Sequence, residues 1–190
     1  DGIARARQTC AEVARLLGCE PEQVLPFSTG VIMEPLPVER IAAGLPRCVA
    51  ALGEKNWAGA ATAIMTTATV AKAFSRRVDI GGHPISVTGI AKGSGMICPN
   101  MATMLVYIFT DAKFDAPTLD AMLRRAADQS FNMLAIDPDT GTSDTCALLA
   151  NGHAEPTHSC PLDAARAPGC LRRSGPTSGS GCEHRPPNPA

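Results

Sequence analysis

The sequence predicts a mixed α/β fold built in layers. Three patterns predict this class: a run of strong helix formers that ends at Gly18, two β-rich runs joined by a Gly-Gly pair at residues 81–82, and an amphipathic helix pattern that follows an apolar run. Helices and strands that alternate along one chain bury their apolar faces by packing helices on a sheet. The chain has 190 residues, 45% of them apolar, which is enough for one core.

The first part of the chain predicts two helices and a short strand. Residues 2–17 combine alanine, leucine and arginine, which favour a helix, and glycine follows them. Residues 24–27 predict a short strand that leads into a turn at residues 28–32. A second helix is expected within residues 38–45, because Pro46 lacks the N–H that a helix interior needs; the helical pattern resumes after it.

The middle of the chain predicts one helix and three strands. Asn56 is expected to be the N-cap of a third helix that runs to residue 65. Residues 74–80 and 83–90 predict two strands joined by a two-residue turn, because a Gly-Gly pair supplies the positive φ that hairpin turns require. The apolar residues 103–110 predict a buried strand.

The pattern after this strand predicts a helix that begins at Asp115. This residue is a good N-cap, and Pro117 suits the first turn. Four apolar residues at helical spacing form the face expected to pack on the sheet: Leu119, Met122, Leu123 and Ala126. Residues 133–136 and 146–149 predict two further strands.

The character of the chain changes near residue 154. Residues 154–190 contain seven prolines, and their only aliphatic residues besides alanine are Leu162 and Leu171. Such a segment buries too little apolar surface to offset its chain entropy. We therefore expect one domain over residues 1–153, followed by a disordered or out-of-frame tail rich in proline, glycine and cysteine over residues 154–190.

Charge and cysteine usage exclude several classes of function. The formal net charge is −1 and there is no basic stripe, which argues against nucleic acid or an anionic membrane as partner. No apolar run approaches the roughly 18 residues that span a bilayer. The eight cysteines are widely and irregularly spaced, without a C-x2–4-C pair, so we expect reduced thiols in a cytoplasmic protein and no metal site.

A glycine-rich loop with one lysine, residues 89–97, is the most informative stretch. It leads through a proline-bent segment to Thr103 and the apolar strand. Glycines allow backbone amides to approach a ligand closely. A threonine at the mouth of such a loop is well placed to be a nucleophile, although the same pattern also describes an ordinary junction between a loop and a strand.

Residues 92–105, Lys-Gly-Ser-Gly-Met-Ile-Cys-Pro-Asn-Met-Ala-Thr-Met-Leu, resemble the self-cleavage segment of the ornithine acetyltransferase family, the glutamate N-acetyltransferases of arginine biosynthesis. The resemblance implies that the layered α/β fold is of that N-terminal-nucleophile-like, self-processing type, incomplete here. It also implies autocatalytic cleavage between Ala102 and Thr103, which makes Thr103 the N-terminal nucleophile of a second subunit.

Other site residues follow from the same resemblance. Thr29 and Gly30 match the family's oxyanion hole, in which they stabilise the negatively charged intermediate. Thr66, Lys92 and Thr103 match positions that bind substrate, and a lysine ammonium suits a substrate carboxylate. Without the resemblance, Thr29 and Gly30 indicate an ordinary turn, Thr66 lies in a threonine-rich strand or helix end, and Lys92 is a solvated surface lysine.

The sequence departs from the family pattern at several positions. Ala68 stands where the family usually has aspartate, and Ala71 where it usually has proline. Residues 137–145 look like a family segment that is altered at three positions: 138, 141 and 143. They do not form a calcium loop, because the glycine comes one place early and residue 148 is leucine. Loss of a carboxylate beside the site favours an inactive chain.

The resemblance implies an acetyltransferase that moves an acetyl group from N-acetylornithine to glutamate through an acetyl-threonine intermediate. No cofactor is expected, and acetyl-coenzyme A is left open as a donor. The two cleavage products are expected to associate, as a heterotetramer. Two other interpretations stay open: a catalytically inactive fragment of that enzyme, and a non-enzymatic interaction module, for which no sequence feature speaks.

Overall fold

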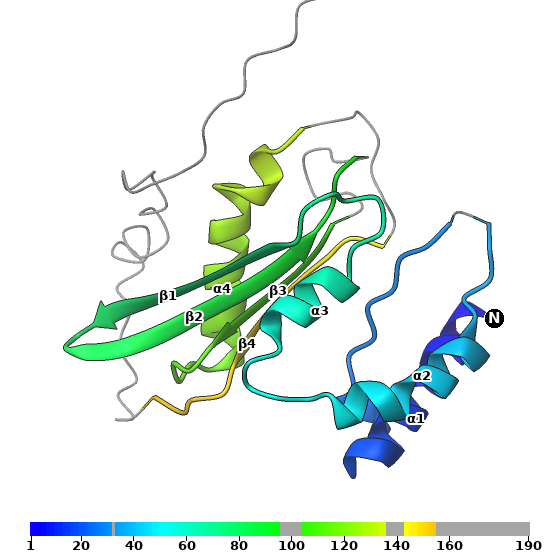
Figure 1. Cartoon of the computed structure of the whole chain (residues 1–190). Coiled ribbons are helices and arrows are strands. Elements are labelled where there is room, and N and C mark those ends of the chain that lie inside the picture. Colours follow the sequence, from blue (N-terminus) through cyan, green and yellow to red (C-terminus); the bar gives the residue numbers. More distant parts are fainter. Residues whose placement is uncertain (32, 96–103, 136–142, 155–190) are drawn as a thin grey trace, which may run out of the picture. The chain divides into compact units, whose positions relative to one another are not determined.

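A computed structural model describes residues 1–31, 33–95, 104–135 and 143–154 (Figure 1). All of them belong to the first of two structural units of the chain, Asp1–Ser159. The tail expected from residue 154 onward therefore lies almost wholly outside the described residues.

Helices and one mixed sheet make up the described part of the chain. The helices are α1 (Gly2–Leu17), η1 (Pro21–Gln23), α2 (Val38–Ala50), α3 (Trp57–Ala63), α4 (Ala116–Asp128) and η2 (Phe131–Met133). The strands are β1 (Lys72–Ile80), β2 (His83–Lys92), β3 (Leu105–Thr110) and β4 (Thr145–Ala150). This composition confirms the mixed α/β class. No described helix is both long enough and apolar enough to cross a membrane.

The strand order in the sheet is β1-β2-β3-β4. The first three strands are antiparallel neighbours, whereas β3 and β4 run parallel, with α4 in the connection between them. Lys92 pairs with Leu105, and Leu105 pairs with Thr145. The end of β2 and the beginnings of β3 and β4 therefore meet at one edge of the sheet, which is where the glycine-rich loop leaves β2.

The hairpin between β1 and β2 confirms the prediction from the Gly-Gly pair. Gly81 and Gly82 have φ values of 64° and 87°, a region that glycine enters without steric cost. The Asp79 carboxylate accepts a hydrogen bond from the Gly82 N–H at 2.8 Å and so closes the turn.

The two faces of the sheet carry different elements. Paired residues of neighbouring strands point to the same face, so Lys92 shares a face with Tyr107 and Phe109. Phe27 packs edge-on against Tyr107, with ring centroids 5.2 Å apart, and Trp57 of α3 packs on Phe109 at 5.0 Å. Helix α4 contacts β4 and covers the opposite face (Figure 1).

Helices α1 and α4 form as predicted. Gly18 ends α1 in the left-handed conformation, with φ of 70°, and its N–H donates to Ala14 at 2.8 Å. The Asp115 side chain caps α4 by accepting a hydrogen bond from the Thr118 N–H at 2.8 Å. The four apolar residues of the expected α4 face are all half-buried.

Two expected strands are not formed. Residues 24–27 are extended, with Val24 at φ −100° and ψ 122°, but they join no sheet in the described part of the chain. Phe27 is accommodated by packing on Tyr107 rather than by a strand ladder, whereas Leu25 is 62% exposed. Of residues 133–136, Met133 ends η2, the next two are irregular and Ile136 lies outside the described residues. A run of four apolar residues is too short for periodicity to tell a strand from a helix end.

Several expected boundaries also differ, and strands β1, β2 and β4 each extend one or two residues beyond a predicted end. Helix α2 continues through Pro46 to Ala50, although Pro46 has no N–H to donate. The turns after Pro46 keep their hydrogen bonds, since the Ala51 N–H donates to the Arg47 carbonyl at 3.1 Å, and α1 packs against the helix. Helix α3 begins after Asn56, its expected N-cap residue, but ends at Ala63. The Asn56 side chain makes no capping hydrogen bond and donates to the Ala51 carbonyl. Strand β3 begins at Leu105; Thr103 lies outside the described residues.

Candidate functional site

A contact between Lys92 and Thr29 is the centre of the candidate site. The Lys92 Nζ donates a hydrogen bond to the Thr29 Oγ1 at 2.7 Å, across 63 positions of sequence. Lys92 is only 3% exposed, whereas Thr29 is half-buried. The structure thus joins a residue predicted to line the oxyanion hole to one predicted to bind substrate. We call these two residues the lysine–threonine pair.

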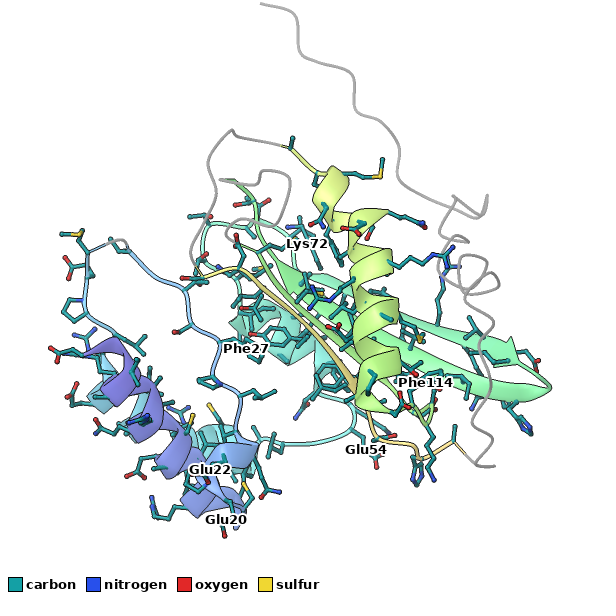
Figure 2. The ribbon with its side chains drawn as sticks, turned by 180° about the vertical axis from the view of Figure 1, so that it is seen from behind. Glu20, Glu22, Phe27, Glu54, Lys72 and Phe114 are labelled. Carbon is teal, nitrogen blue, oxygen red and sulfur yellow. The ribbon has the colours of Figure 1, made fainter. Side chains whose placement is uncertain are left out.

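Different contacts position the two residues of the pair. Lys92 is the last residue of β2, so strand pairing with Leu105 fixes its backbone. Thr29 lies on an irregular extended segment, two residues after Phe27 (labelled in Figure 2), and the contact of that ring with Tyr107 holds the segment against the sheet. Edge-to-face aromatic pairs of this kind add stability beyond their buried area.

Asp144 brings negative charge to the same edge of the sheet. Burial lowers the pKa of Lys92, and the charge of Asp144 opposes this effect. Asp144 directly precedes β4, and its carboxylate accepts a hydrogen bond from the Met104 N–H. The Met104 carbonyl in turn accepts from the Thr145 N–H at 2.9 Å. The backbone just before β3 is therefore held from both sides by residues 144 and 145.

The geometry of the pair leaves the Thr29 hydroxyl able to act as a donor. A lysine ammonium has no acceptor, so Thr29 must accept in this bond, and its own O–H remains directed elsewhere. A charged donor behind a hydroxyl polarises it and strengthens the bond that it makes next. Such a group suits an oxygen that becomes negative during a reaction.

Gly30 is not required by the packing of the described chain. A Cβ at this position would meet no atom within 4 Å, and its φ lies outside the left-handed region. The turn expected at residues 28–32 comes later, where Met33 has φ of 71° and the Glu34 N–H donates to Val31 at 3.2 Å. Among the residues that the structure describes, nothing therefore fills the space beside the Gly30 backbone.

Thr66 lies in the bend between α3 and β1, where its side chain is exposed. Among the described residues, no hydrogen bond joins it to the lysine–threonine pair. Its segment is instead tied to the glycine-rich loop by Thr67, whose hydroxyl lies 2.9 Å from that of Ser94, and by Lys72 (Figure 2), whose ammonium donates to Gly93 at 2.8 Å. These contacts bring the segment next to the residues that follow Lys92.

The predicted cleavage site, Ala102 and Thr103, lies outside the described residues, and so does most of the 137–145 segment. Their roles stay predictions. Sequence reasoning missed Asp144, although it lies in a stretch that resembles the family. The missing information was the strand register, which places residue 144 beside Met104.

The fold and site define a mixed α/β protein with a buried lysine and a threonine hydroxyl at one edge of its sheet. The chain matches the model of the ArgJ family over residues 1–167, and it belongs to that family. It is 51% identical over 154 residues to the arginine biosynthesis bifunctional protein ArgJ of Methylococcus capsulatus. That match covers 81% of this chain and 38% of the relative, so the chain spans well under half the length of the curated relative.

Proposed function

We propose that this chain carries part of an arginine-biosynthesis acetyltransferase that moves an acetyl group from N-acetylornithine to glutamate through Thr103. The observation that carries the proposal is the 2.7 Å hydrogen bond of the lysine–threonine pair. It joins two residues that the family resemblance names for one reaction centre. Membership of the ArgJ family supports the reaction class.

The first step is self-cleavage between Ala102 and Thr103. The Thr103 hydroxyl attacks the Ala102 carbonyl carbon, the peptide C–N bond breaks, and the nitrogen leaves as the α-amine of Thr103. Water then opens the resulting ester, which releases the Ala102 carboxylate and restores the hydroxyl. Cleavage is also activation, because a threonine hydroxyl is a weak nucleophile without a base and the freed α-amine, with an ordinary pKa near 8, is such a base.

Acetyl transfer then proceeds in two halves. The Thr103 hydroxyl attacks the acetyl carbonyl of N-acetylornithine, and ornithine leaves with the proton that the α-amine took from the hydroxyl. The amine of glutamate attacks the acetyl-threonine ester, and N-acetylglutamate leaves as the threonine hydroxyl is restored. Each half passes through a tetrahedral oxyanion, and acetyl-coenzyme A is an alternative donor of the same group.

The remaining site residues have distinct roles in this scheme. The Thr29 hydroxyl and the Gly30 amide stabilise each oxyanion, and one such donor is typically worth about 3 kcal/mol. Lys92 supplies the positive charge for a substrate carboxylate and for polarising Thr29. Thr66 contacts substrate from the segment that Thr67 and Lys72 anchor to the glycine-rich loop.

The fold type and the assembly belong to the same proposal. The mixed sheet is the part of an N-terminal-nucleophile-like, self-processing fold that carries the cleavage segment between β2 and β3. The two cleavage products stay associated, as a heterotetramer, in the cytoplasm. Residues 1–153 form the domain, and residues 154–190 form a tail with no part in the reaction.

A second candidate is a fragment without activity of its own. Ala68 stands where the family usually has aspartate, and the chain spans 38% of the length of its relative. In this case the lysine–threonine pair is an inherited structure that no longer serves a reaction. An uncleaved chain that binds neither substrate is the expected behaviour.

Mass spectrometry of the purified chain separates the two candidates. Self-cleavage should give two products whose masses add up to that of the intact chain plus one water, with Thr103 as the new N-terminus. Thr103→Ala should stay intact. Thr62→Ala, which removes an exposed hydroxyl from α3, is the matched control and should cleave as the wild type does. A wild-type chain that stays whole after prolonged incubation would support the inactive fragment.

A further inference from the structure

We propose that Asp144 is a positioning residue, which holds the backbone that follows Thr103 and links it to the lysine–threonine pair. The inference rests on the proposed function of Thr103. It extends that function to a residue that neither the glycine-rich motif nor the oxyanion segment contains.

Two hydrogen bonds hold the backbone of Met104. Its N–H donates to the Asp144 carboxylate, its carbonyl accepts from the Thr145 N–H, and the residue is 5% exposed. Met104 directly follows Thr103 in sequence, so its amide is the first described group after the predicted nucleophile. A hydrogen bond to an ionised acceptor is shorter and stronger than a neutral one. Asp144 therefore fixes the point from which the nucleophilic residue extends.

Lys92 lies near charged and titratable groups, and within the described part of the chain these come from three segments. Asp144 comes from the segment before β4, Tyr107 from the same face of β3, and Lys72 from β1, where its ammonium donates to Gly93, the residue after Lys92. Burial raises the pKa of Tyr107, which stays neutral. The extended segment contributes the Thr29 hydroxyl, which does not titrate.

Asp144 is thus the group that counteracts burial at Lys92. Burial lowers the pKa of Lys92 and the Asp144 charge raises it. Without the carboxylate, the amine loses its proton at a lower pH. A neutral amine neither attracts a substrate carboxylate nor polarises Thr29 as an ammonium does. One carboxylate therefore links the backbone before β3 to the lysine–threonine pair.

Asp144→Asn tests this role, because the amide keeps an acceptor for the Met104 N–H and loses only the charge. Asp120→Asn, which removes an exposed charge from α4, is the matched control. The Lys92 side chain is titrated by NMR in the whole chain, and the self-cleavage rate is followed against pH. Asp144→Asn should shift the Lys92 titration to lower pH. It should also slow cleavage by about tenfold, with the alkaline limb moved in the same direction. Asp120→Asn should change neither.

The outcomes separate the inference from the proposed function. A folded Asp144→Asn chain with an unchanged Lys92 titration overturns the role of Asp144 in the charge of Lys92. If the wild-type chain never cleaves, Thr103 is not a nucleophile and Asp144 has no role in positioning it. The titration of Lys92 then still shows whether Asp144 affects the pKa of Lys92. If Asp144→Asn does not fold, Asp144→Glu replaces it: this variant keeps the charge, so the Lys92 titration should hold while cleavage slows. A shifted titration in this variant, or unslowed cleavage, counts against the inference.

Discussion

A double-mutant cycle on the lysine–threonine pair is the most direct test of the candidate site. Thr29→Val removes the hydroxyl but keeps the branched shape of the side chain. Lys92→Met removes the ammonium but keeps most of the apolar stem. The double variant lacks both ends of the bond. The cycle isolates the interaction between the two groups from the separate cost of each change.

The expected coupling follows from the geometry of the bond. Its donor is charged, its length is 2.7 Å, and Lys92 is 3% exposed. A hydrogen bond to a charged group contributes about 1.5–3 kcal/mol. Because Thr29 is half-buried and water competes for it, we expect a coupling near the lower end, about 1.5 kcal/mol. The double variant should therefore be destabilised by about 1.5 kcal/mol less than the sum of the single variants.

Urea unfolding of the four chains, followed by circular dichroism, measures the coupling. Ser75 and Thr88 form a matched reference, since their hydroxyls lie 2.8 Å apart in an exposed and uncharged pair. A cycle of Ser75→Ala and Thr88→Val should give a coupling below about 0.5 kcal/mol. Additive effects at Thr29 and Lys92 within the same margin would refute the assignment of the two residues to one unit.

Two further predictions follow from single residues. Gly30→Ala should leave the free energy of unfolding unchanged or raise it by up to about 1 kcal/mol, because the added Cβ meets no atom of the described residues within 4 Å. The same Cβ crowds the amide of residue 30, so self-cleavage should slow about tenfold or more. Urea midpoints and cleavage rates measure both effects, and cleavage at the wild-type rate would count against the oxyanion role. Burial raises the pKa of the Cys146 thiol from 9.0 to about 11. At pH 9, about half of the thiols with a pKa of 9.0 are ionised, but only about 1% of those with a pKa of 11. Because the thiolate is the nucleophile, iodoacetamide should modify Cys146 roughly fifty times more slowly in the folded chain than in urea at this pH. Because only the unfolded state loses this proton, Cys146 should lower stability as pH rises from 9 to 11, and equal alkylation rates in both states would contradict the burial of the thiol.

The sequence alone was sufficient for elements whose signals are local. The hairpin turn at Gly81 and Gly82 needs positive φ, the start of α4 needs the Asp115 carboxylate, and the end of α1 needs Gly18. Each of these residues acts on backbone groups only a few positions away. The motif at residues 92–105 could likewise be recognised from the sequence, because a resemblance between continuous segments needs no tertiary contact.

Local signals failed where packing outweighed them. Residues 24–27 have the composition of a strand but are held by the ring of Phe27 on Tyr107. Pro46 removes one hydrogen bond from α2, yet contact with α1 and the bonds on either side preserve the helix. Intrinsic secondary-structure propensity contributes little free energy per residue, and burying the apolar face of a helix or an aromatic side chain contributes more.

Tertiary structure alone decided which contacts join the residues of the candidate site. Thr29 meets Lys92 across 63 positions, and Asp144 meets Met104 across 40. Neither contact follows from spacing, because both depend on the register in which β2, β3 and β4 align and on the path of an irregular segment over one face of the sheet. Local conformation is set by short-range sterics and backbone bonding, whereas these contacts are set by how separate elements close on a common core.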